Sequence, residues 1–272
     1  MGISAIEVGT VQANGTTLHY ESRGEGSAIL LIAGGLADAG QFGEFSDVLG
    51  RDHRVITYDR RGNSRSPAPE GWTTTTVEQQ SDDAAALLVA LGVSRPLVYG
   101  HSIGAPIALD LGLRHPATVQ GVALHDPAMM GTLADPGAVM AVLGPVIGEA
   151  MTAGGPPAAA DAFYRFAVGP AIDALDPAVY ERMKADGGVL FGVEFESLSG
   201  WLPDEGALRE NRVPVRLLVG AESPPFFREA AEWLSARLDA KIADVPGGHG
   251  AAFVHPNEVA QRLEDFIGEV GR

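Results

Sequence analysis

The chain has 272 residues, of which 46% are hydrophobic, and a single α/β domain of this size can bury a large core. Its formal net charge of −16 and isoelectric point near 4.7 argue against nucleic acids and anionic membranes as partners, since both require clustered Lys and Arg. Because the chain has no cysteine, disulfides and thiolate chemistry are excluded as well.

The N-terminal half begins with a predicted β-hairpin. Residues 10–21 alternate around Asn14-Gly15, which is typical of a two-residue hairpin turn. Apolar runs of strand length then alternate with segments of helical periodicity, which predicts a mainly parallel sheet with helices on both faces. The expected strands are 27–32, 54–58, 97–101, 119–124, 215–220 and 240–245, and the expected helices are 77–91, 103–114, 225–238 and a last one from about residue 257.

Two segments are expected to be loops, and one region departs from the strand–helix alternation. We expect a flexible loop after Gly34-Gly35 and a mobile, glycine-rich loop over residues 246–256. Residues 128–210 show helical patterns, many glycines and prolines, and no convincing strand. The sequence therefore predicts a core domain made of residues 1–127 and 211–272, with an inserted helical cap of residues 128–210.

Neither a signal peptide nor a membrane span is predicted. The first eight residues contain no basic segment followed by an apolar one, and we find no stretch that reaches the ~18 apolar residues of a span. A cytoplasmic location is the expectation that follows.

The candidate nucleophile is Ser102, in the sequence Gly100-His101-Ser102-Ile103-Gly104. This Gly-x-Ser-x-Gly pattern stands between a predicted strand and a predicted helix, where a sharp turn exposes the serine hydroxyl at the end of the sheet. Side chains at the two glycine positions would crowd that turn. A serine nucleophile needs a base, and His249 follows the last predicted strand, whose carboxyl end lies at the same sheet edge as Ser102.

Backbone N–H groups are the expected donors to a developing oxyanion. One is that of Ile103, which follows the nucleophile, and the other lies in the loop after strand 27–32. We assign this second donor to Gly35, with Gly34 adjacent. Neither a metal nor a cofactor is expected for this chemistry.

Four ordered signatures together resemble the α/β-hydrolase fold superfamily. They are Ala33-Gly34-Gly35, the run from Tyr58 to Ser64, the Ser102 pentapeptide and Gly248-His249. The resemblance spans nearly the whole chain, and it implies the α/β-hydrolase fold and serine chemistry without fixing a substrate. In two places the sequence departs from many members: Ala33 stands where they have His, and Ser223 stands where they carry the acid of a catalytic triad.

The acid must therefore come from another position, and two carboxylates are candidates. Glu222 is shifted by one residue from the usual place, whereas Asp126 directly follows a predicted strand. Around both segments the chain is similar to the zearalenone lactonases, which place their acid after that earlier strand and use Glu there. We favour Asp126 as the partner of His249, and Glu222 is the alternative.

The sequence predicts a serine hydrolase that cleaves a carboxylic ester or lactone of a neutral, apolar substrate through an acyl-enzyme. Perhydrolase, thioesterase and C–C hydrolase chemistry remain open, as does a non-catalytic ligand-binding protein of the same fold. The predicted cap has many apolar side chains, and Arg165, Arg182 and Lys184 are the only cationic residues between Asp126 and Asp204. The residues expected to contact substrate are Gly34, Leu36, His101, Met129 and Trp201.

Overall fold

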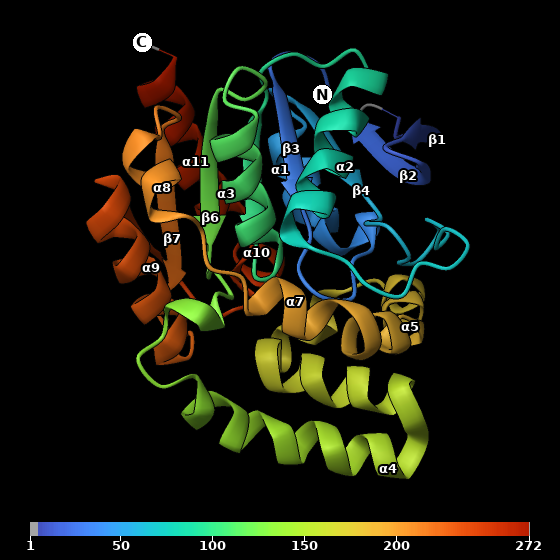
Figure 1. Cartoon of the computed structure of the whole chain (residues 1–272). Helices are drawn as coiled ribbons and strands as arrows, with labels where there is room; N and C mark the ends of the chain where they lie inside the picture. The colour runs from blue at the N-terminus through green and yellow to red at the C-terminus, as the bar shows by residue number, and fades with distance from the viewer. Residues whose placement is uncertain (1–4, 272) are drawn as a thin grey trace.

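The computed structural model describes residues 5–271, so residues 1–4 of the N-terminal segment discussed above lie outside the described residues. An eight-stranded sheet forms the centre of the structure (Figure 1). Its strands are β1 (Glu7–Ala13), β2 (Thr16–Arg23), β3 (Ala28–Ile32), β4 (Arg54–Tyr58), β5 (Leu97–His101), β6 (Gly121–His125), β7 (Val215–Gly220) and β8 (Lys241–Val245).

The strand order is β1-β2-β4-β3-β5-β6-β7-β8. β1, β2 and β4 pair antiparallel, and every other pair is parallel. Asn14 and Gly15 form the predicted hairpin turn, and both have a positive φ, as a type I′ turn requires. In the parallel part of the sheet, all strands end at the same edge, which places the residues after β3, β5, β6, β7 and β8 side by side.

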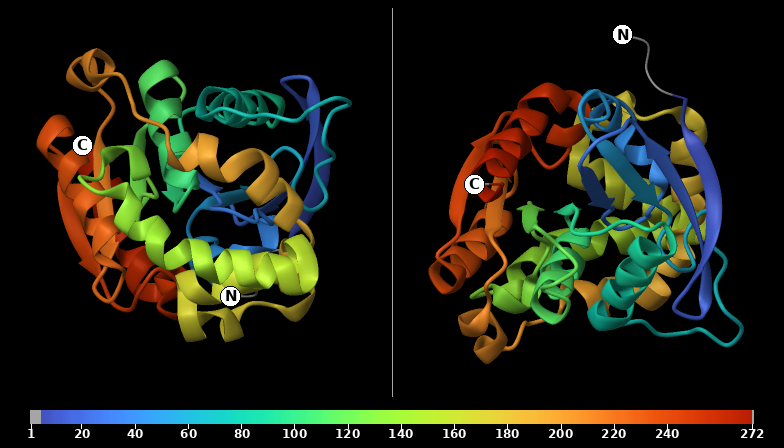
Figure 2. Two further views of the ribbon diagram at one scale, coloured as in Figure 1. Left: turned by 60° about the horizontal axis from the view of Figure 1, so that its bottom comes forward. Right: turned by 90° about the horizontal axis from the view of Figure 1, so that it is seen from above.

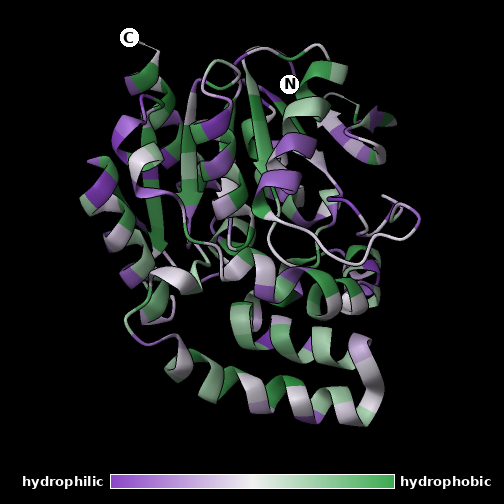
Figure 3. Ribbon diagram, in the orientation of Figure 1, coloured by the Kyte–Doolittle hydropathy of each residue, from purple (hydrophilic) through white to green (hydrophobic). Residues whose placement is uncertain are grey.

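Helices cover both faces of the sheet (Figure 2). One face carries α2 (Val77–Ala90), α3 (Gly104–Arg114), α8 (Glu205–Glu210) and α9 (Pro225–Leu238); the other carries α1 (Gly43–Leu49), α10 (Ala251–Val254) and α11 (Pro256–Val270). The central strands are apolar along most of their length because both of their faces are buried (Figure 3). This architecture confirms the predicted α/β-hydrolase fold.

Two segments that we expected to be loops contain helices. The chain after Gly34-Gly35 forms a 3-10 helix, η1 (Ala39–Phe42), and then α1, so the expectation of a flexible loop there is wrong. Asp38 caps η1, because its carboxylate accepts the backbone N–H of Gly40. The glycine-rich segment after β8 contains α10, whose residues 251–253 are buried. Burial against the core fixes both segments despite their short length.

A long helical insertion lies between β6 and β7, at the carboxyl edge of the sheet (Figures 1 and 2). It comprises η2 (Met130–Thr132), α4 (Pro136–Val168), η3 (Gly169–Ala174), α5 (Pro177–Ala185), α6 (Gly187–Val189), the π-helix η4 (Leu190–Glu194) and α7 (Phe195–Ser199). No strand occurs in this part of the described chain, as the sequence predicted.

The helix α4 is the largest element of the insertion. Gly154 and Gly155 have non-helical backbone angles and divide it into two arms, which run antiparallel (Figure 1). The segment Pro136–Ala174 is long and apolar enough to cross a membrane by length and composition, and 6% of its most apolar window is buried. It is a candidate span by length and mean hydropathy alone, since Glu149 and Asp161 interrupt its apolar residues and the helix is divided at Gly154 and Gly155.

Candidate active site

Ser102 lies on the sharp turn between β5 and α3, with a φ of 56°. Few residues other than glycine adopt a positive φ, and here the surrounding hydrogen bonds hold it. The backbone N–H of Ser102 donates to the carbonyl of His125 (3.0 Å), and its own carbonyl accepts the N–H of Ala105 (3.0 Å). The turn is therefore tied to β6 and to the first turn of α3.

The two glycines of the pentapeptide are required by close backbone contact. A Cβ at Gly100 would lie 2.4 Å from the carbonyl oxygen of Gly104, and one at Gly104 would lie 2.3 Å from the carbonyl oxygen of Ile32. Real Cβ atoms do not approach backbone oxygens this closely. The strand and the helix can meet behind Ser102 only because neither position has a side chain, as the sequence predicted.

Asp126 and His249 are brought together from the ends of β6 and β8. The Nδ1 atom of His249 lies 3.0 Å from Oδ2 of Asp126, and the carboxylate is fully buried. Asp126 also accepts the hydroxyl of Ser223 at Oδ2 (2.6 Å) and the backbone N–H of Gly220 at Oδ1 (3.1 Å). Ser223 thus occupies the place where many members of the superfamily have the acid, and it holds Asp126 instead.

The charge of Asp126 is stabilised by these contacts. Burial by itself would raise the pKa of Asp126, but the hydrogen bond from His249, the nearby rings of His125 and His249, and the hydroxyl of Ser223 hold it below its usual range. Glu222 is exposed and makes no side-chain hydrogen bond to the residues that the structure describes. Of the two candidate acids, the structure places Asp126 against His249.

Aromatic rings enclose His249 on both sides. His101 stacks on it at 4.5 Å between ring centroids, and Phe227 stacks at 4.2 Å with an interplanar angle of 10°. Nε2 of His101 also donates to the backbone carbonyl of His249 (2.8 Å). Burial, followed by the neighbouring rings of His249 and His125, lowers the pKa of His101 well below its usual value. A neutral His101 can therefore anchor the loop that carries His249.

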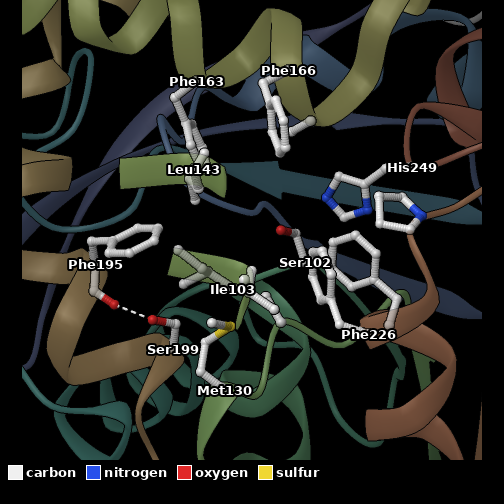
Figure 4. Close-up of a pocket in the computed structure, with 15 residues that line it drawn as sticks. Ser102, Ile103, Met130, Leu143, Phe163, Phe166, Phe195, Ser199, Phe226 and His249 are labelled. Carbon is white, nitrogen blue, oxygen red and sulfur yellow. Dashed lines mark hydrogen bonds between the residues drawn. The ribbon is translucent and has the colours of Figure 1, made fainter. Parts of the chain in front are cut away.

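The space around Ser102 has two lobes, and Ser102, His249, Phe163 and Ala167 border both. Apolar side chains make up most of the wall of the large lobe (Figure 4). Besides the shared residues, it is lined by Ile103, Ala128, Met130, Val139, Leu143, Phe166, Phe195, Ser199, Pro224, Phe226 and Phe227. The small lobe is lined, besides the shared residues, by Gly34, Gly35, Gln41, His101, Tyr164 and Val168.

Residues 27–144 match the family model described as the alpha/beta hydrolase fold. A putative carbamate hydrolase, RutD, from Azorhizobium caulinodans is 30% identical over 93% of this chain and 96% of its own length. The chain belongs to the α/β-hydrolase fold family. It is a hydrolase by this relationship.

Other relatives of this hydrolase include a zearalenone hydrolase from Cladophialophora bantiana, which is 27% identical over 91% of each chain. An uncharacterized hydrolase, YraK, from Bacillus subtilis is 37% identical over 128 residues, and the match covers about half of each chain (47%). Among solved structures, the enol-lactonase from Burkholderia xenovorans LB400 aligns with a TM-score of 0.71 and 23% identity over 96% of this chain and 100% of its own. The structural match supports the fold alone.

The loop that carries Gly34 and Gly35 in this hydrolase is held by a buried arginine. Arg60, which follows β4, donates to the carbonyl of Gly34 from Nη2 (2.9 Å) and to that of Ala33 from Nε (3.3 Å). Its guanidinium also pairs with the carboxylate of Glu194 in the insertion, at 2.8 Å for Nη2 and Oε2. Both side chains are fully buried. One ion pair therefore connects the insertion to the backbone beside Ser102.

Three of the residues expected to contact substrate do not border either lobe. Leu36 has a φ of 59°, and its side chain is fully buried in the core. Met129 is 1% exposed within the core cluster, whereas the adjacent Met130 lines the large lobe. The indole N–H of Trp201 donates to Glu78 on α2 (2.9 Å), which turns this ring away. Of the other expected residues, Gly34, Gly35 and His101 border the small lobe, and Ile103 borders the large one.

Sequence reasoning missed several residues that line the lobes of this hydrolase. Phe226 and Phe227 begin α9 directly after the β7 loop, so their place after a strand end was a usable signal. Gln41 gave no such signal, because it lies in a segment that we expected to be a loop. Its partner Tyr164 is 123 positions away in the sequence.

Proposed function

We propose that this protein is a serine hydrolase that cleaves a carboxylic ester or lactone of a neutral, apolar substrate. The observation that carries the proposal is the arrangement of three residues. Ser102 lies on a strained turn and borders an apolar lobe that His249 also borders, and Nδ1 of His249 contacts the buried carboxylate of Asp126. Its relative from Cladophialophora bantiana, named a zearalenone hydrolase, supports a lactone as one substrate class.

In the proposed mechanism, Ser102 Oγ attacks the ester carbonyl carbon while Nε2 of His249 takes its proton. Asp126 keeps the other ring proton on Nδ1 and stabilises the imidazolium. The backbone N–H groups of Ile103 and Gly35 donate to the negatively charged oxygen of the tetrahedral intermediate. The C–O bond then breaks as His249 protonates the leaving alcohol, and a water molecule, activated by His249, hydrolyses the acyl-enzyme. With a lactone, the alcohol remains part of the acyl group.

The surroundings of the site favour an uncharged substrate. No Lys or Arg borders either lobe among the described residues. Three cationic residues of the insertion pair with acidic side chains: Arg165 with Asp161, Arg182 with Asp38, and Lys184 with Glu181. We propose a division of labour in which the core of residues 1–127 and 211–272 carries the reacting groups and the cap of residues 128–210 selects the substrate.

A carbamate is the second candidate substrate, because RutD of Azorhizobium caulinodans matches the chain over nearly its full length. The apolar wall of the large lobe favours esters and lactones with an extended apolar part over a small polar carbamate. A substrate panel of aryl esters, neutral lactones, simple carbamates and anionic esters compares these classes directly. A preference for carbamates or anionic esters would refute the apolar-substrate assignment.

Labelling with a fluorophosphonate tests the serine mechanism. The protein is incubated with the probe, digested and analysed by mass spectrometry, with Ser102→Ala as the control. We expect one label on the peptide that contains Ser102 and no label on the variant. A folded wild-type protein that takes up no label on Ser102 would contradict the mechanism and favour a non-catalytic binding protein.

A further inference from the structure

A residue that lines the small lobe has a buried side-chain donor without a hydrogen-bond partner. Gln41 on η1 borders this lobe together with Gly34, Gly35 and Ser102, and it is 3% exposed. Its Nε2 has no hydrogen-bond partner among the residues that the structure describes. Of the described buried polar atoms without a partner, this is the one that belongs to a residue lining the lobes at Ser102. A primary amide carries two donor hydrogens, and leaving them unsatisfied is unfavourable.

The orientation of the Gln41 amide is determined by its neighbours. The hydroxyl of Tyr164 donates to Oε1 of Gln41 (3.3 Å), and burial raises the pKa of Tyr164, so this phenol keeps its proton. The backbone of η1 is fixed as well, because the N–H of Gln41 donates to the carbonyl of Asp38 (3.1 Å) and the N–H of Ala39 donates to Asp59 (2.6 Å). With Oε1 occupied, the NH₂ group is the part of the Gln41 side chain that has no partner among the described residues.

Among the described residues, the wall of the large lobe has no side-chain donor of this kind. Besides Ser102, the wall of the large lobe has one residue with a side-chain hydroxyl, Ser199. The Oγ of Ser199 donates to the carbonyl of Phe195, as the dashed line in Figure 4 shows. The two lobes therefore differ in chemistry as well as in size. One is larger and apolar, and the other is smaller and is lined by Gln41, whose amide donor has no partner, together with the proposed oxyanion loop.

We propose that the small lobe is a subsite for the smaller part of an ester or lactone substrate that carries its own oxygen acceptor, such as an ether or a second carbonyl. Nε2 of Gln41 donates a hydrogen bond to that oxygen, while the larger apolar part of the substrate fills the other lobe. An alkyl group of the same length would leave the buried donor unpaired, so Gln41 discriminates against it. This inference rests on the proposed function.

Two pairs of matched esters test the subsite from either side of the scissile bond. The acyl pair is p-nitrophenyl methoxyacetate and p-nitrophenyl butyrate, which differ by one oxygen in place of a methylene. The alcohol pair is the 2-methoxyethyl and butyl esters of 3-phenylpropanoic acid. For each pair, the ratio of kcat/KM for the oxygen-containing ester to that for the alkyl ester is measured in the wild type and in Gln41→Met. Differences in intrinsic reactivity cancel when the ratios of the two proteins are compared.

In the pair whose variable group enters the small lobe, we expect Gln41→Met to lower the ratio about threefold to tenfold, as loss of one neutral hydrogen bond predicts. Tyr164→Phe frees the amide to rotate, so it should lower the same ratio to a smaller extent, and it carries the test if Gln41→Met does not fold. Ratios that stay within twofold of the wild type in both pairs would overturn the subsite while leaving the serine mechanism intact. If the wild type cleaves none of the four esters, or if Ser102→Ala cleaves them equally well, both proposals fail.

Discussion

Replacing Asp126 by Asn keeps the shape of the side chain and removes its charge. In the variant, Oδ1 still accepts the N–H of Gly220, so Nδ2 faces Nδ1 of His249 and can donate a hydrogen bond to it. That contact favours the tautomer with its proton on Nε2, which cannot accept the proton of Ser102. The amide also cannot offset the imidazolium charge inside a site where Asp126 is fully buried. In the serine protease template the same change lowers kcat ~10⁴-fold, and we expect a loss of three to four orders of magnitude here.

The matched control for this experiment is Glu222→Gln, which removes a charge from an exposed loop two residues after β7. Turnover of one activated ester is followed for both single variants and for the double variant, with circular dichroism to confirm the fold. We expect Glu222→Gln to change kcat less than twofold, and the double variant to resemble Asp126→Asn. If Glu222→Gln abolishes activity and Asp126→Asn retains most of it, the acid has been assigned to the wrong residue.

Two further predictions concern stability. Gly104→Ala should lower the free energy of unfolding by more than ~2 kcal/mol, because the added Cβ would lie 2.3 Å from the carbonyl oxygen of Ile32. The control Gly148→Ala, in open space on α4, should change the free energy of unfolding by less than ~1 kcal/mol. Equal melting temperatures for the two variants would refute the steric argument. Asp186 accepts the N–H of Ser64, and burial, with nearby carboxylates, raises its pKa to about 7. Above about pH 4 the unfolded chain releases the proton of Asp186, whereas the native state keeps it until about pH 7. Asp186 therefore destabilises the fold increasingly between pH 4 and 7, by up to ~4 kcal/mol. Asp186→Asn should therefore match the wild type at pH 4 and melt at a higher temperature at pH 8, whereas the exposed control Asp173→Asn should show no such pH-dependent difference.

Local sequence signals predicted most of the sheet. Asn14-Gly15 fixes its hairpin turn through positive φ angles that few other residue pairs adopt, and the apolar runs of β4 and β7 match the predicted bounds. The pentapeptide around Ser102 identified the β5–α3 turn because its glycines are needed for steric reasons that act within a few residues. Features whose cause lies within a short stretch of chain were therefore predictable.

The features that the sequence left open or did not reveal depend on contacts between distant parts of the chain. The choice between Asp126 and Glu222 required knowing which carboxylate reaches His249, which is 123 positions from Asp126. Gln41 is oriented by Tyr164, and η1 exists because Asp59 and Asp38 bind its first N–H groups. No pattern within one segment contains this information.

The buried pair of Arg60 and Glu194 limits how freely the insertion can be exchanged for that of another family member. Glu194 lies in the insertion, and Arg60 holds the carbonyls of Ala33 and Gly34 beside the nucleophile. A transplanted insertion without a carboxylate at this place would leave a guanidinium uncompensated in the interior, which is a costly arrangement. The insertion is thus not an independent module: swaps that aim to change substrate range must keep this carboxylate or replace Arg60 at the same time.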